Sequence, residues 1–141
     1  MAQSFHFKLV TPTGIVFEGE VESVTAVNPL GEFGVLAEHI NFITSLNPGI
    51  LTIKLDGNNY RHYVVPGGLA EVKDGVLTML ADEAQPAESL ERGEAAGELD
   101  AAEERLKHMS FYQVEYAEAV HELELARARL RAAEMNHGAR A

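Results

Sequence analysis

The residues best equipped for chemistry in this chain are Glu38 and His39, a carboxylate directly followed by an imidazole. Such a pair can act as general acid and base when both groups reach one substrate. Neighbouring residues of a β-strand, however, point to opposite faces of the sheet. If residues 38–39 belong to a strand, an enzyme site here needs a concave polar pocket and a second acid that converges on His39.

Other kinds of reactive or ligand-binding site are missing from the sequence. The chain contains no cysteine, which excludes disulfides, thiolate nucleophiles and cysteine-bound zinc and fits a reducing compartment. The six histidines are scattered, and none is paired at the i, i+4 spacing by which a helix holds zinc. Neither a G-x-S-x-G elbow nor a Walker A run occurs. The sequence therefore predicts no catalytic residue, no metal site and no cofactor.

The run 31–39 has features of a contact loop. Gly31 and Gly34 allow a turn, and the dipeptide Asn28-Pro29 just before them is a turn signal. We expect this turn to leave one strand, present Glu32 and Phe33, and re-enter the fold near His39. Exposed loops on a rigid scaffold are common sites of partner contact. A tight β-turn with purely structural glycines is the simpler interpretation of these residues alone.

The secondary structure that the sequence predicts changes from strand to helix near Ala84. Residues 1–84 contain 6 alanines and residues 85–141 contain 13, and the first part holds most of the β-branched residues, aromatics and glycines. Turn signals recur about every ten residues in the first part, as in a sandwich or barrel of short strands. We expect an antiparallel β-sandwich over 1–84 and a two-helix unit over 85–141.

Alternation and turn residues predict the strands of the first part. Two hairpins are expected, one around residues 56–59 and one around residues 73–75. The predicted strands span residues 5–10, 20–27, 50–55, 60–65, 71–72 and 76–81.

In the second part Pro86 marks the start, and Ser89 is a candidate for the helix N-cap or a position near it. Two apolar stripes at helical spacing, joined by a short connection, predict an antiparallel helical hairpin. Gly93 and Gly97 weaken the beginning of its first helix, each by up to ~1 kcal/mol relative to Ala. The stripes are Ala95, Leu99, Ala102, Leu106 and Met109, then Tyr116, Val120, Leu123, Ala126, Leu130 and Ala133.

Charge limits the partners of the chain. The net charge of −11 argues against binding to nucleic acid or to an anionic membrane surface. No signal peptide is evident, and no apolar stretch approaches the ~20 residues of a spanning helix. From Leu125 onward, however, the chain has four arginines and one acid. These arginines either complement the helix dipole and stay solvated or form a docking surface for an acidic partner.

Four stretches together resemble one family, the ε subunit of rotary F-type ATP synthases (δ in mitochondria). Each motif is weak alone, but their order and spacing are specific and cover essentially the whole chain. The stretches are Pro12-x-Gly14-x-Val16-Phe17-x-Gly19; residues 31–39 continuing to Leu46-x-Pro48-Gly49-x-Leu51; residues 67–72 with 76–84; and residues 114–117 with the helix that follows.

The resemblance implies a β-sandwich followed by a helical hairpin, and a non-catalytic subunit of the central stalk of a proton-translocating synthase. In this family the sandwich binds the γ subunit and rests on the membrane c-ring. By position, Leu30, Gly31, Glu32 and Phe33 resemble the c-ring-facing tip, and His39 resembles a γ-facing residue. The subunit is then peripheral, on the cytoplasmic face of the bacterial inner membrane.

In many bacterial members of the family the hairpin also inhibits ATP hydrolysis. It extends along the stalk, and its basic second helix meets acidic segments of the catalytic β subunits. The resemblance places that contact at Arg127, Arg129 and Arg131. This implication favours the docking interpretation of the arginines over the purely solvated one.

The chain departs from the family pattern in two places. Asn41 stands where many members have proline. Some members bind ATP through a motif of the form Ile/Leu-Asp-x-x-Arg-Ala, and the matching positions here are Leu90, Glu91, Glu94 and Ala95. Because a carboxylate replaces the arginine, we expect ATP binding to be weak or absent.

Two other functions stay open on the sequence. The first is a free-standing β-sandwich protein-binding module whose hairpin is an oligomerisation device. The second is an enzyme with a carboxylate–histidine site near His39.

Overall fold

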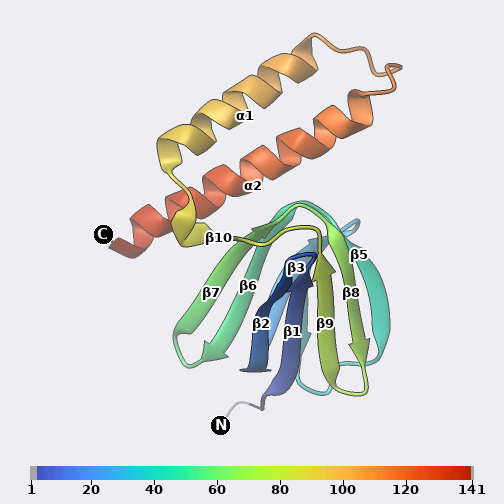
Figure 1. The fold of residues 1–141 in the computed structure, drawn as a ribbon, viewed down its shortest axis with the longest axis vertical. Helices are drawn as coiled ribbons and strands as arrows, with labels where there is room; N and C mark the ends of the chain where they lie inside the picture. Colours follow the sequence, from blue (N-terminus) through green and yellow to red (C-terminus); the bar gives the residue numbers. More distant parts are fainter. Residues whose placement is uncertain (1–2, 141) are drawn as a thin grey trace.

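The computed structural model describes residues 3–140, with side chains up to residue 135. Ten strands precede two helices, as Figure 1 shows. The strands are β1 (Phe5–Thr11), β2 (Gly14–Val21), β3 (Ser23–Asn28), β4 (Gly31–Leu36), β5 (Phe42–Leu46), β6 (Gly49–Asp56), β7 (Asn59–Val65), β8 (Gly68–Lys73), β9 (Val76–Ala81) and β10 (Gln85–Pro86). A 3-10 turn, η1 (Ala87–Ser89), leads to helices α1 (Arg92–Lys107) and α2 (Tyr116–Arg140).

The strands form two five-stranded sheets, with orders β2-β1-β9-β8-β5 and β10-β7-β6-β3-β4. All neighbours pair antiparallel except β1 and β9, which are parallel. The predicted fold class, a largely antiparallel β-sandwich followed by a helical hairpin, is confirmed.

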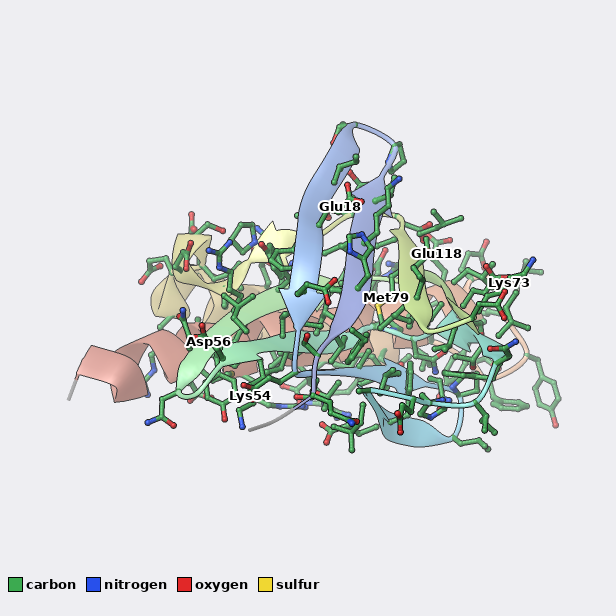
Figure 2. All side chains as sticks on the ribbon, turned by 90° about the horizontal axis from the view of Figure 1, so that it is seen from below. Glu18, Lys54, Asp56, Lys73, Met79 and Glu118 are labelled. Atoms are coloured by element: carbon green, nitrogen blue, oxygen red, sulfur yellow. The ribbon has the colours of Figure 1, made fainter. Side chains whose placement is uncertain are left out.

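The core lies between the two sheets and follows from alternation along the strands. In β1, Phe5, Phe7 and Leu9 are buried while the residues between them are half-buried on the outer face. In β9, Leu77 and Met79 are fully buried in the same way, and Figure 2 shows Met79 inside the molecule. Each such side chain contributes roughly 1.5–3 kcal/mol on burial.

The predicted single strand over 20–27 is wrong, because the chain changes sheets there. Strand β2 ends at Val21, and β3 starts at Ser23 in the other sheet. Between them the Glu22 backbone N–H donates to the Lys54 carbonyl at 2.8 Å, and the Glu22 carboxylate lies 3.4 Å from Lys54 Nζ. No glycine or proline marks this crossing, so the local sequence reads as one continuous strand.

Both predicted hairpins are confirmed, but their loops are shorter than expected. Strands β8 and β9 are joined by Asp74 and Gly75, whose φ angles of 51° and 82° are left-handed. Two successive left-handed residues are typical of the type I′ turn, which matches the twist of the flanking strands. Strands β6 and β7 are joined by Gly57 and Asn58 in place of the four residues expected.

The two helices pack antiparallel, and α2 lies across one end of the sandwich with α1 on its far side (Figure 1). Ala128 and Ala132 of α2 are buried against Val64 of β7 and Ala87 of η1. The ring Nε2 of His121 also donates a hydrogen bond to the Pro66 carbonyl at 2.8 Å. The hairpin is therefore folded down onto the sandwich in this structure.

The first helix is capped by a different residue from the one predicted. Ser89 lies in η1, where its hydroxyl donates to the Pro86 carbonyl at 2.7 Å. Glu91 is the N-cap of α1, and its carboxylate accepts from the backbone N–H groups of Gly93 and Glu94 at 2.8 and 2.7 Å. A short 3-10 turn between Pro86 and α1 delays the start of the helix, so Ser89 lies near the N-cap, as one form of the prediction allowed, but is not the capping residue.

The side chain of His6 joins β1 to β2 by contacts with two glutamates of β2, one of which, Glu18, is labelled in Figure 2. The ring nitrogens of His6 lie 2.9 Å from Glu18 and 3.2 Å from Glu20. Hydrogen bonds to Glu18 and then to Glu20 raise the pKa of His6 above its ordinary 6.5. Since the folded state holds the proton more tightly, this interaction stabilises the fold most below pH 6.5.

We therefore predict a pH-dependent difference in the free energy of unfolding between the wild-type chain and His6→Gln. The wild type should be the more stable below pH 6.5, and its advantage should disappear as the pH rises through the folded-state pKa. Urea unfolding of both proteins across this range measures the difference. A difference that does not change with pH would contradict the charged contact.

Candidate functional site

The β3–β4 turn carries the most exposed of the residues expected to face a partner. Leu30 is 96% exposed, and its backbone N–H donates to the Asn28 side chain at 2.9 Å. Gly31 follows with φ of 121°, a left-handed value that favours glycine. The sequence thus builds a rigid turn that points one leucine into solvent.

The expected loop over residues 31–33 is wrong, because these residues belong to β4. Asn28 pairs with Gly31 and Ala26 pairs with Phe33, so the turn closes immediately after Leu30. Glu32 is exposed on the strand, whereas Phe33 is half-buried and packs edge-on against Phe42 with ring centroids 6.0 Å apart. Of the four predicted tip residues, Leu30 and Glu32 can meet a partner through their side chains.

The dipeptide 38–39 lies in the loop between β4 and β5, not in a strand as assumed from the sequence. Glu38 has a left-handed φ of 65° and an exposed side chain. The His39 ring nitrogen Nδ1 lies 2.9 Å from the Ile40 carbonyl oxygen, and the ring is tilted by 47° against Phe42 with centroids 4.9 Å apart. Within the described residues, no carboxylate makes a hydrogen bond or ion pair with His39, so the second acid that an enzyme site needs is not supplied there.

An apolar row crosses the outer face of the β2-β1-β9-β8-β5 sheet. Ile15 pairs with Val10, Val10 pairs with Leu80, and Leu80 pairs with Leu69 on adjacent strands. Ile15, Leu80 and Leu69 are 57%, 51% and 40% exposed. Ile43 on the edge strand β5 and Ile40 in the loop before it are also exposed. We call Ile15, Val10, Leu80, Leu69 and Ile43 the outer apolar row.

Sequence reasoning missed the outer apolar row, although one signal was present. Strand β9 is almost continuously apolar (Val76-Leu77-Thr78-Met79-Leu80-Ala81) instead of alternating with charged residues. Such a run is typical of a strand covered on both faces. Exposed apolar surface of this kind marks an interaction site more often than chance scatter does.

The three arginines predicted to contact the catalytic subunits do not share one face of α2. Arg127 and Arg131 are exposed and line a groove between α2 and the β3–β4 turn. Arg129 points toward α1, where its guanidinium lies 3.2 Å from Glu98 and 3.2 Å from the Gln85 side chain. The separation follows from helix geometry, since residues two apart lie on roughly opposite sides.

The four positions of the degenerate nucleotide motif do lie together. Leu90, Glu91, Glu94 and Ala95 line one hollow with Glu98 and Arg129. Three acidic residues therefore line the hollow with one guanidinium, and that guanidinium is already paired with Glu98. A polyphosphate would meet net negative charge at this hollow.

The described part of the chain shows no grouping of three or more side chains able to hold a metal ion. Over the same residues, no helix is long and apolar enough to span a bilayer.

Comparison with known proteins gives these surfaces a context. Residues 4–87 match the family model described as ATP synthase, Delta/Epsilon chain, beta-sandwich domain. The chain belongs to this family. A protein of Afipia carboxidovorans named ATP synthase epsilon chain is 44% identical over 105 residues, which cover 74% of this chain and 76% of the relative. A protein of the same name from Nitratidesulfovibrio vulgaris is 40% identical over 131 residues, 93% of this chain and 96% of the relative.

Solved structures agree with the family assignment. A chain in the cryo-EM structure of the Euglena gracilis mitochondrial ATP synthase, comprising OSCP, F1 and the c-ring, aligns with a TM-score of 0.79 and 30% identity. The alignment covers 93% of this chain and 81% of that chain. A chain of the Tetrahymena thermophila synthase central stalk and c-ring, 16% identical with a TM-score of 0.60 over 93% of this chain and 97% of that chain, shares the fold. The resemblance to the ATP synthase ε subunit is thus confirmed.

We predict that the full chain binds ATP only weakly, because Glu91, Glu94 and Glu98 line the motif hollow. Isothermal calorimetry should detect no binding below about 1 mM ATP. Glu94→Arg restores the motif's guanidinium and should raise the affinity. Glu103→Arg, with the same charge change at an exposed position of the same helix, should not. A micromolar dissociation constant for the wild type would refute the prediction.

Proposed function

We propose that this chain is a non-catalytic central-stalk subunit of a proton-translocating ATP synthase, coupling rotation of the c-ring to the catalytic head. Family membership supports the assignment, and the outer apolar row is the observation in this chain that carries it. Exposed apolar side chains on four of the five strands of this sheet, Ile15, Leu80, Leu69 and Ile43, indicate a surface that a partner covers. We place the subunit peripherally on the cytoplasmic face of the bacterial inner membrane, with γ, the c-ring and the β subunits as its partners.

The γ subunit is the proposed partner of the outer apolar row. His39 and the exposed Ile40 lie in the loop that enters β5, the edge strand of the same sheet. We place His39 in the same contact, because it precedes Ile40 in the loop at this edge. The β3–β4 turn, with Leu30 at its tip, is the proposed contact with the c-ring.

We further propose that the hairpin inhibits ATP hydrolysis when α2 leaves the sandwich and presents its arginines to acidic segments of β. In the folded hairpin Arg129 is 26% exposed and held by Glu98 and Gln85, with Glu83 at 4.0 Å. These contacts must break before the Arg129 guanidinium can bind a carboxylate of β. The Glu98 carboxylate therefore competes with β for the same guanidinium.

The test is ATP hydrolysis by the catalytic complex depleted of its own ε subunit, with this chain added back. Arg127→Ala/Arg129→Ala/Arg131→Ala should bind the complex but not inhibit it. Glu98→Gln should inhibit about two- to fivefold more strongly than the wild type, since it weakens one exposed ion pair of the folded hairpin. Glu103→Gln, an exposed acid of the same helix, is the matched control and should leave inhibition unchanged.

Two results separate the parts of this proposal. Inhibition by the triple alanine variant equal to that of the wild type rules out the arginine contact with β. Failure of the wild-type chain to bind the complex at all removes the central-stalk assignment and favours a free-standing binding module.

A further inference from the structure

The groove between α2 and the β3–β4 turn brings cations next to the tip of the sandwich. Its sandwich side includes Asn28, Leu30 and Pro48, and its helix side includes Arg127 and Arg131. This juxtaposition exists because α2 lies across the end of the sandwich (Figure 1). The two arginines are one helical turn apart and therefore point the same way.

The two guanidinium groups of the groove are available for binding. Among the described residues neither Arg127 nor Arg131 forms an ion pair, in contrast to Arg129 on the other side of the helix. One acid, Glu124, also lines the groove, which leaves it with a net positive charge. Such a patch stands out on a chain whose net charge is −11.

We propose that Arg127, Arg131 and Leu30 form one composite surface, which binds carboxylate-bearing loops of the ring that the turn contacts. The proposal rests on the c-ring contact of the proposed function. A leucine that shares a groove with two guanidinium groups suits a loop with an apolar contact point and a neighbouring carboxylate, since guanidinium binds carboxylates in a bidentate manner. Anionic lipid is the poorer partner, because the overall charge of the chain opposes approach to a negative membrane surface.

The composite surface links ring binding to the state of the hairpin. Arg127 and Arg131 lie beside Leu30 only while α2 is folded onto the sandwich. A ring that binds all three residues therefore binds the folded state more tightly, and by linkage it must stabilise that state. The same two arginines then have alternative acidic partners, the ring when the hairpin is folded and the β subunits when it is extended.

The test is binding of the full chain to purified c-ring of the same organism, in detergent, at low and at high salt. Arg127→Gln/Arg131→Gln should weaken binding about three- to tenfold at low salt, and salt should reduce the difference. Arg92→Gln/Lys107→Gln removes the same charge from exposed positions on α1 and should bind like the wild type. Adding the ring should slow hydrogen exchange of the α2 amides in the wild type and less so in Arg127→Gln/Arg131→Gln.

Leu30→Ser separates the proposal from the contact on which it rests. If Leu30→Ser weakens ring binding and Arg127→Gln/Arg131→Gln does not, the composite surface is wrong and the turn contact stands. If neither variant weakens binding, the c-ring contact of the turn is wrong as well. Equal binding of the wild type to ring-free vesicles of anionic lipid would overturn the ring as the partner.

Discussion

The contact between α2 and the sandwich determines which arginines of α2 are exposed to a partner. Its buried centre is made by small side chains, Ala128 and Ala132, against Val64 and Ala87, and the half-buried Leu125 of α2 packs beside them. A buried methyl or methylene contributes about 0.8 kcal/mol, against about 1.5–3 kcal/mol for a leucine or valine side chain. Alanines let the helix approach closely but stabilise the docked state only modestly. The same contact positions the arginines, and the release that we propose requires this contact to break.

The arginines of α2 lie on two different faces of the helix. On one face Arg129 is held by Glu98 and Gln85, so it adds a polar contact to the weak apolar docking of the hairpin. On another face Arg127 and Arg131 are unpaired among the described residues and lie near Leu30. An exposed ion pair contributes up to about 1 kcal/mol, so a partner with several acids can displace it. Under the proposed function, the binding partners of the chain determine whether the hairpin is folded.

The sequence predicts local features of the fold well, because they depend on spacing along the chain. Alternation of Phe5, Phe7 and Leu9 identifies the inner face of β1, and Asp74-Gly75 identifies a turn. The change of sheet at Glu22 depends on a contact with Lys54 of a distant strand, so local patterns do not reveal it.

The candidate site shows the same division between local and tertiary information. The position of Leu30 in an exposed turn agrees with the resemblance, whereas the burial of Phe33 depends on Phe42 across the fold. The separation of Arg129 from Arg127 and Arg131 follows from helical spacing and was available from the sequence. The face of α2 that meets the sandwich could not be predicted, because Ala128 and Ala132 do not differ in type from the alanines of the predicted apolar stripe, Ala126 and Ala133.

The most direct test of the central claim is binding of the full chain to a catalytic complex depleted of its ε subunit. Gel filtration should show the wild-type chain eluting with the complex and Leu69→Glu/Leu80→Glu eluting alone, since the charges fall within the outer apolar row. A folded double variant that binds as well as the wild type would contradict the assignment of this face. A wild-type chain that elutes only as its own oligomer would contradict the central-stalk function.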